Sequence, residues 1–375
     1  MSDQTPPQDP KSPNSNKDNS NPDYIPTPPK SITKTVWKVF RKAKKVTSQA
    51  NSIINGSVGD KFQEHSILKP LDIKMNFYHR QNPITLHKES LRKRSNYSYN
   101  DKSVSNKICV LIHGLVFNET CWQFKDRSDY GKKLEEDFGY TPFYLRYNTG
   151  LHISDNGQEL AILLEELYQN YPTQIEEVYF ICHSMGGLLM HSAAYYAQEE
   201  GFDWVKKTKK VFLLGTPHLG SFFERFANVT TNILQRVPNW HTRLVGKVIN
   251  LRSAGIKDLR YGYLREEDWK DKDPDTLLEN TKNEVPKLDG VEYFIISGRL
   301  TQEETHWVNK FFGDILVSKK SANAHFIDSD ETDSEITNAH QFAATHHFKL
   351  LTMNEVYEKL KFWIERKYFL KKYNT

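Results

Sequence analysis

The sequence is poor in cysteine and contains no long apolar run. Only three of its 375 residues are cysteines (Cys109, Cys121 and Cys182), too few for a disulfide framework. We therefore expect a reducing compartment, the cytoplasm. No apolar run approaches the roughly 20 residues that a membrane-spanning helix needs, and the polar N-terminus does not have the pattern of a secretory signal peptide. These absences argue against a secreted or membrane-spanning protein.

The sequence also lacks a large charge excess and any cluster of metal ligands. A net charge of +4 is weak for a nucleic-acid-binding protein of this length. No Cys/His cluster has zinc-ligand spacing. The acidic stretch 328–335 carries Asp333 where an EF-hand loop needs its glycine, so we expect a solvated loop there. We predict no cofactor, no metal and no nucleic-acid partner, and the sequence leaves the oligomeric state open.

Three regions differ in composition. Residues 1–30 are rich in Pro, Ser, Asn and Asp, which predicts a disordered polar tail. Residues 31–66 form a basic amphipathic helical segment, with no acidic residue between positions 24 and 59. This helix either docks on the main domain with a solvated basic face, which we favour slightly, or lies on an anionic membrane surface. We expect residues 67–375 to form the main folded domain.

The main domain alternates apolar strands with amphipathic helices. Asn156 is a candidate cap for a helix over 156–168, and further helices are expected over 185–198 and 355–368. This rhythm predicts the α/β class, with a mostly parallel sheet covered by helices on both faces. Residues 221–287 interrupt this alternation of strands and helices, so we predict a helical, lid-like insertion there, over one end of the sheet. The expected strands are 71–79, 107–112, 142–147, 177–182, 211–214 and 291–296.

A serine follows the strand 177–182 directly, in the stretch FICHSMGGLLM. In a parallel sheet, chemistry is found at the carboxyl ends of the strands. Ser184, followed by Gly186 and Gly187, has the strand–turn–helix context of a nucleophile elbow, usually written G-x-S-x-G. Cys182 stands where the first glycine is usual, and we expect its small thiol to pack in the core.

A serine nucleophile needs a base and an orienting acid, which follow it in the chain order Ser, Asp/Glu, His. Asp314, in the stretch GDILV, fits the acid, although a turn residue is the alternative reading. His346 and His347, in the stretch THHFKLL, both fit the base on spacing alone, with a helix-capping or surface histidine as the alternative. Ser184, Asp314 and one of these histidines therefore form the predicted triad.

The stretch IHGL at 112–115 ends another buried strand. Gly114 lets the backbone turn, so that the N–H of Leu115 can point at the same oxyanion as the N–H of Met185. Two such donors make an oxyanion hole, in which the removal of one donor typically costs about 3 kcal/mol of transition-state stabilisation.

Seven stretches, taken in chain order, resemble successive motifs of serine α/β-hydrolases. The nearest resemblance is to the bacterial lipase/esterase-like group related to GPI inositol-deacylase and triacylglycerol lipases. It implies the α/β-hydrolase fold, His347 rather than His346 as the base, and Asp314 as the acid, although Ile315 replaces a glycine of that motif. The stretches are IHGL, YNTGLHISDNG (147–157), CHSMGG, LGTPHLGS (214–221), RSAGIKDLRYG (252–262), GDILV and HHFKLL.

These features predict a serine hydrolase that cleaves carboxylic esters through an acyl-enzyme. The resemblance implies a phospholipid or glycolipid acyl ester. One alternative is an acyltransferase or amidase with the same triad, and another is a non-catalytic membrane-binding module. The insertion would wall an apolar acyl pocket with Phe222, Phe223, Phe226, Trp240 and Leu251 among its residues.

Overall fold

A computed structural model describes residues 48–62, 72–93, 105–216, 253–270, 283–298, 338–345 and 347–373. The predictions made for the tail (1–30), for the basic stretch 31–46 and for the acidic stretch 328–335 lie outside these ranges. Most of the predicted lid also lies outside them. Of the helices that the structure describes, none combines the length and the apolar character of a membrane span.

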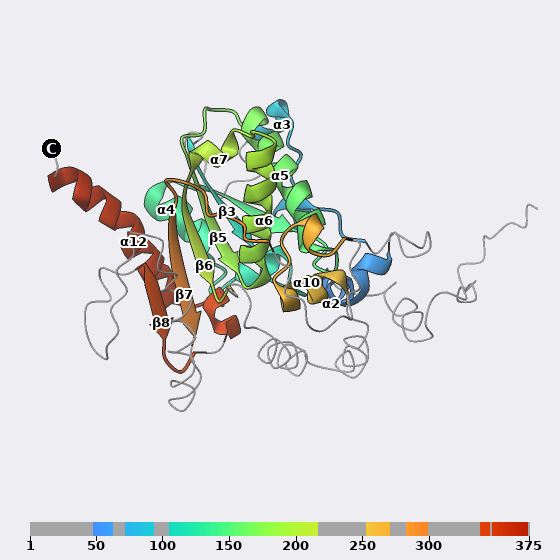
Figure 1. The fold of residues 1–375 in the computed structure, drawn as a ribbon. Helices are drawn as coiled ribbons and strands as arrows, with labels where there is room; N and C mark the ends of the chain where they lie inside the picture. Colours follow the sequence, from blue (N-terminus) through green and yellow to red (C-terminus); the bar gives the residue numbers. More distant parts are fainter. Residues whose placement is uncertain are drawn as a thin grey trace, which may run out of the picture.

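An eight-stranded sheet forms the centre of the described structure, in the order β2-β1-β4-β3-β5-β6-β7-β8 (Figure 1). The strands from β4 through β8 in this order pair in parallel, whereas β1 is antiparallel to both β2 and β4. The predicted mostly parallel sheet is confirmed. The strands are β1 (Asn76–His79), β2 (Asn82–Pro83), β3 (Lys107–Ile112), β4 (Thr141–Arg146), β5 (Glu177–His183), β6 (Thr208–Leu214), β7 (Glu292–Gly298) and β8 (Ala339–Phe342).

Helices cover both faces of this sheet (Figure 1). Successive strand residues point to opposite faces, so Phe180 and Cys182 enter the core under α5 and α6, while Tyr179 and Ile181 enter the core under α4 and α12. This two-sided burial explains why the central strands are apolar at nearly every position. The larger helices are α4 (Tyr130–Phe138), α5 (Ile153–Asn170), α6 (Met185–Glu199) and α12 (Asn354–Tyr373).

Shorter helices lie around the sheet. They are α2 (Ser48–Val58), α3 (Lys88–Arg92), α7 (Trp204–Lys207) and α10 (Ala254–Tyr261), with the 3₁₀ turns η1 (Gly59–Lys61), η4 (Glu119–Trp122), η6 (Glu266–Asp268) and η7 (His347–Leu351). The strand order, the nearly all-parallel pairing and the serine turn after β5 together make this an α/β-hydrolase fold.

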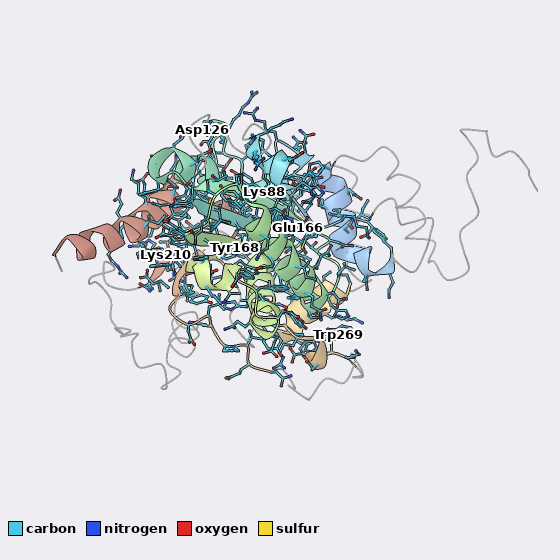
Figure 2. All side chains as sticks on the ribbon, turned by 90° about the horizontal axis from the view of Figure 1, so that it is seen from above. Lys88, Asp126, Glu166, Tyr168, Lys210 and Trp269 are labelled. Atoms are coloured by element: carbon cyan, nitrogen blue, oxygen red, sulfur yellow. The ribbon has the colours of Figure 1, made fainter. Side chains whose placement is uncertain are left out.

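A buried lysine ties two strands to the C-terminal helix. Lys210, on β6, is 1% exposed, and its Nζ lies 2.6 Å from a carboxylate oxygen of Glu292 on β7. The same Nζ donates to the carbonyl oxygen of Trp363 on α12 at 3.3 Å. A buried ammonium group needs such partners. Figure 2 shows Lys210 on the α12 side of the molecule and Trp269 at the other end.

The prediction that Asn156 caps a helix was wrong. Helix α5 begins three residues earlier, at Ile153, and Asn156 lies in its first turn. The Ile153 amide donates to Oδ2 of Asp258 at 2.7 Å, so a carboxylate from α10 replaces a local cap. The side chain of Asn156 instead donates to the carbonyl oxygen of Asn148 at 2.9 Å.

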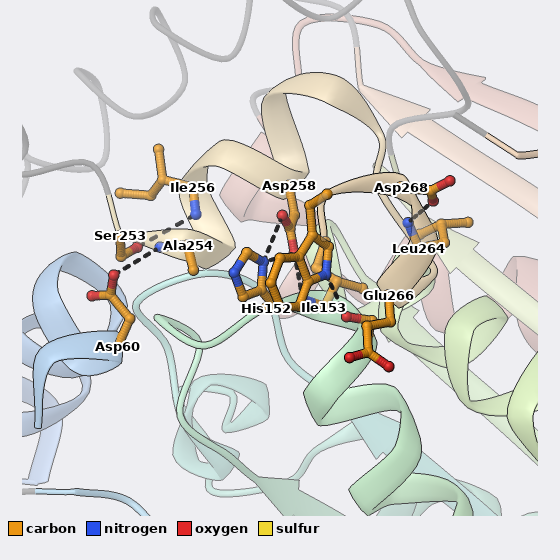
Figure 3. Close-up of polar contacts among 12 residues, drawn as sticks. Asp60, His152, Ile153, Ser253, Ala254, Ile256, Asp258, Leu264, Glu266 and Asp268 are labelled. Atoms are coloured by element: carbon orange, nitrogen blue, oxygen red, sulfur yellow. Dashed lines mark hydrogen bonds and ion pairs between the residues drawn. The ribbon is translucent and has the colours of Figure 1, made fainter. Parts of the chain in front are cut away.

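Asp258 lies at the centre of a polar network between α5 and α10 (Figure 3). Nδ1 of His152 is 3.0 Å from each of its carboxylate oxygens. The His152 ring stacks on Trp269 with centroids 3.6 Å apart and an interplanar angle of 2°. The Trp269 indole donates to Oγ of Ser154 at 2.9 Å. This network fixes the end of α5 that lies closest to α10.

The N-terminal segment joins the same region. Oγ of Ser253 donates to the carbonyl oxygen of Gly56 on α2 at 2.8 Å. The Ala254 amide donates to Asp60 at 3.3 Å (Figure 3). The Gly255 amide donates to the carbonyl oxygen of Gly150 at 3.1 Å. The stretches 56–62, 147–157 and 253–262 therefore meet in one structural junction.

We expect Asp258→Ala to lower the free energy of unfolding by about 3 kcal/mol, because it leaves buried donors without their acceptor. The Asp258 side chain is 1% exposed, and burial raises the pKa of its carboxyl. The measurement is urea unfolding followed by circular dichroism. Asp155→Ala, an exposed position in the first turn of α5, is the control and should change stability by less than about 1 kcal/mol. Equal effects of the two substitutions would contradict this role of Asp258.

Candidate active site

Ser184 occupies a strained turn at the carboxyl end of β5. Its backbone has φ 54° and ψ −124°, a conformation that is costly for a residue with a side chain. Two hydrogen bonds hold the turn: the Ser184 amide donates to Leu214 on β6 at 2.9 Å, and the Gly187 amide donates to the Ser184 carbonyl oxygen at 3.1 Å. The turn has the geometry of a nucleophile elbow.

Small residues allow α6 to start close to the sheet. A Cβ added at Gly186 would lie 2.7 Å from the carbonyl oxygen of His113. This clash would be with a backbone atom, which cannot move aside as a flexible side chain can. Cys182, two residues before the serine, is fully buried under α5 and α6, and burial raises the pKa of its thiol. Cys182 is therefore a core residue, as its size and position predicted.

The loop after β3 lies against the elbow. A Cβ added at Gly114 would lie 2.9 Å from Cβ of Ser184. The next residue, Leu115, and the residue after the serine, Met185, are 2% and 1% exposed. Within the described ranges no hydrogen bond uses the amide of either residue. The loop that carries Leu115 thus lies against Ser184, and Met185 follows Ser184 directly.

Helix α2 supports this loop. Val116 has φ 62°, and its amide donates to Oγ1 of Thr149 at 3.2 Å. Gln49 Nε2 donates to the carbonyl oxygen of Val116 at 3.3 Å, and Asn118 Nδ2 donates to Oγ of Ser48 at 3.1 Å. This role of the segment before residue 67 was not predicted from the sequence. The closely spaced glycines at 56 and 59, which pack against this loop and the 148–150 turn, are the signal that was available.

His347 lies at the same end of the sheet. A Cβ added at Gly215 would lie 2.7 Å from Nδ1 of His347, and Gly215 directly follows Leu214, which binds the Ser184 amide. The His347 ring is 4.6 Å from the ring of His183, the residue before the serine. The structure therefore brings Ser184, Leu115, Met185 and His347 together. Asp314 and His346 lie outside the described residues.

Two buried histidines flank the elbow, and the sequence analysis assigned no role to either. His113 has its ring stacked on Tyr147 at 4.5 Å and its Nδ1 2.9 Å from the carbonyl oxygen of Gly114, and burial lowers its pKa to about 3. His183 is fully buried, and burial lowers its pKa well below the usual value. Both rings are therefore neutral at pH 7. The available sequence signal is their position: His183 ends β5 directly before Ser184, and His113 follows β3 two residues before Leu115.

The described residues contain no group of three or more His, Cys, Asp or Glu side chains arranged to hold a metal ion.

A family of known proteins matches the part of the chain that carries the elbow. Residues 102–270 match the family described as "Putative serine esterase (DUF676)". The matched range includes Leu115, Ser184 and Met185 and ends before Asp314 and His347. No curated protein sequence matches the chain.

Several solved structures are similar to this chain at low identity. The lipase BlEst2 of Bacillus licheniformis is 18% identical, with a TM-score of 0.37 over 70% of this chain and 94% of the lipase. Esterase B of Lactobacillus rhamnosis is 14% identical, with a TM-score of 0.39 over 89% and 97% of the two chains. The esterase Pf2001 of Pyrococcus furiosus is 12% identical, with a TM-score of 0.37 over 70% and 82%. These values are too low to support a conclusion about substrate.

Proposed function

We propose that Ser184 is the nucleophile of this carboxylic ester hydrolase, whose residues 102–270 match the family described as "Putative serine esterase (DUF676)", and that the enzyme acts on acyl esters of lipids. The observation that carries the proposal is the strained backbone of Ser184 at the carboxyl end of β5, beside which the amides of Leu115 and Met185 have no hydrogen-bond partner among the described residues. Strained backbone of this kind is typical of functional sites, and in a nucleophile elbow the strained turn holds the serine hydroxyl clear of the sheet.

In the proposed reaction, Oγ of Ser184 attacks the ester carbonyl carbon while a ring nitrogen of His347 takes the hydroxyl proton. The amides of Leu115 and Met185 stabilise the negative charge on the carbonyl oxygen. His347 then gives its proton to the leaving alcohol, and an acyl-enzyme forms. Water attacks this acyl group with His347 again as base, which releases the acid and restores Ser184. Asp314 is proposed to hold the tautomer of His347.

An apolar acyl group is favoured by the surroundings of the elbow. Phe117 and Phe348 are partly buried, and their ring centroids are 5.6 Å apart beside His183 and His347. The family resemblance and the aromatic residues of the proposed lid over 221–287 also favour an apolar acyl group. Aromatic and aliphatic walls suit a hydrocarbon chain.

A panel of p-nitrophenyl esters with acyl chains of graded length, followed by a diacyl phospholipid, tests this substrate class. We expect kcat/KM to rise with chain length beyond acetate. A maximum at acetate that falls steadily with length would contradict a lipidic substrate. Assays with added alcohols or amines separate the alternatives: an acyltransferase would form new esters in preference to free acid, and an amidase would prefer the matched anilide.

We also propose that the basic stretch 31–46 attaches the protein to anionic membranes. Seven basic residues lie between positions 30 and 45, with no acidic neighbours: Lys30, Lys34, Lys38, Arg41, Lys42, Lys44 and Lys45. The stretch ends two residues before Ser48, whose Oγ accepts a hydrogen bond from Asn118 beside the elbow. Attachment there would keep the site near a lipid substrate.

The full chain is expected to sediment with anionic vesicles at low salt, because each Lys or Arg near such a surface contributes on the order of 1 kcal/mol. Binding should fall as salt rises and screens the charges. The triple variant Lys38→Gln, Arg41→Gln, Lys42→Gln should lose most of the binding and keep its activity on a short soluble ester. Unchanged binding of this variant, or equal binding to neutral vesicles, would contradict the proposal.

A further inference from the structure

His183 lies between the loops that carry the other proposed catalytic groups. It is the last residue of β5, is fully buried, and has its Nε2 3.2 Å from the carbonyl oxygen of His347. A carbonyl oxygen can only accept a hydrogen bond, so Nε2 carries the proton and donates. The ring that precedes the proposed nucleophile thus anchors the backbone of the proposed base.

The other edge of the His183 ring faces the oxyanion loop. A Cβ added at Gly114 would lie 3.1 Å from Nδ1 of His183, and within the described residues this nitrogen has no hydrogen-bond partner. A neutral ring, with its proton on Nε2 and none on Nδ1, tolerates an unpaired Nδ1 better than a charged ring would. The ring therefore spaces the Gly114 backbone from the His347 backbone.

Aromatic side chains leave the His183 ring little room to move. Phe117 and Trp122 meet it edge-on, with centroids at 6.1 and 6.5 Å, and Phe348 lies at 6.4 Å. In such a packed site the ring has one orientation, so the single donor Nε2–H is always aimed at the same carbonyl group.

We propose that His183 is a positioning residue that fixes the distance from Ser184 to the His347 loop and to the oxyanion loop. The proposal rests on the proposed function, since it assigns His183 a part in the same reaction. Displacement of a catalytic group by about 1 Å can cost on the order of 100-fold in rate. A change at His183 should therefore act on kcat, because it moves groups that are needed in the transition state and leaves the acyl pocket in place.

The test compares His183→Phe, which keeps a planar ring and removes the donor, with His183→Gln, which offers an amide N–H near the position of Nε2. We expect kcat of His183→Phe to fall about 10- to 100-fold with KM changed less than about 3-fold. His183→Gln should recover most of that loss. A residue that only fills space would give no rescue by Gln.

The control is His79→Phe. His79 is another buried histidine, 4% exposed, and burial lowers its pKa to about 4. It lies on β1, which β4 and β3 separate from β5. His79→Phe should keep the wild-type kcat even where its thermal midpoint falls as much as that of His183→Phe.

Unchanged kcat in His183→Phe, an effect on KM alone, or equal loss in the Phe and Gln variants would each overturn the proposal. If His183→Phe does not fold, His183→Asn replaces it, because the shorter Asn amide cannot reach the His347 carbonyl; Gln must then be more active than Asn. The proposed function is tested separately with Ser184→Ala in a protein that keeps His183: esterase activity retained by this variant would contradict the proposed function itself.

Discussion

Ser184→Ala is expected to abolish ester hydrolysis and leave the fold intact. Removal of a serine nucleophile lowers kcat on the order of 10⁴-fold or more, because no other group can form the acyl-enzyme. Alanine keeps the Cβ that already fits the strained turn, and the two backbone hydrogen bonds of the turn do not involve the hydroxyl. Initial rates on a soluble ester and the thermal midpoint, measured on the same preparation, check both parts.

Ser192→Ala provides the matched control for Ser184→Ala. Ser192 is a buried serine on the same helix, α6, and its hydroxyl donates to the carbonyl oxygen of Leu264 at 2.6 Å. Its substitution should lower stability by about 1 kcal/mol and leave kcat within a few-fold of wild type. Residual activity within a few-fold of wild type in Ser184→Ala would exclude Ser184 as the nucleophile.

His347→Ala is expected to be nearly as inactive as Ser184→Ala, whereas His346→Ala should stay within about 10-fold of wild type. A nucleophile and its base act as a unit, so the loss of either costs most of the rate, and the double variant Ser184→Ala, His347→Ala should be no worse than the single ones. His347 is the histidine that the structure places against Gly215 and His183. Steady-state kinetics of the wild type and the four variants make the comparison.

The reverse ranking of the two histidine variants would move the base by one position. It would also remove the reason for the hydrogen bond from His183 to the His347 carbonyl oxygen, because that bond would then anchor a residue outside the reaction. Similar activity in both variants and wild type would show that neither histidine is the base.

The sheet could be predicted from the sequence because its central strands are buried on both faces and read as apolar runs. β3 and β5 are examples, and the predicted boundaries fall within one residue of the observed ones. β8 (Ala339–Phe342) is only partly buried at the sheet edge and mixes polar with apolar residues, so it has no such signature. Helix α4 was missed for a related reason: its main anchor, Tyr130, binds the carbonyl oxygen of Leu350 at 2.7 Å, a contact that periodicity cannot show.

The local parts of the candidate site were also accessible from the sequence. Ser184, Met185 and Leu115 belong to short motifs whose geometry depends on adjacent residues, so the turn and its amides could be placed from the motifs. Contacts between residues far apart in the sequence could not be predicted in this way. Gln49 reaches Val116 across 67 positions, and Asp258 caps α5 across 105. No local pattern encodes such pairs, because each arises only once the chain has folded.

The most direct measurement of the central claim is peptide mass spectrometry after reaction of the full chain with a fluorophosphonate, which modifies activated serines. We predict one adduct, on the peptide that contains Ser184, formed much more slowly in His347→Ala and absent in Ser184→Ala. An adduct on another residue, or no adduct on an intact folded protein, would contradict Ser184 as the activated nucleophile of this esterase.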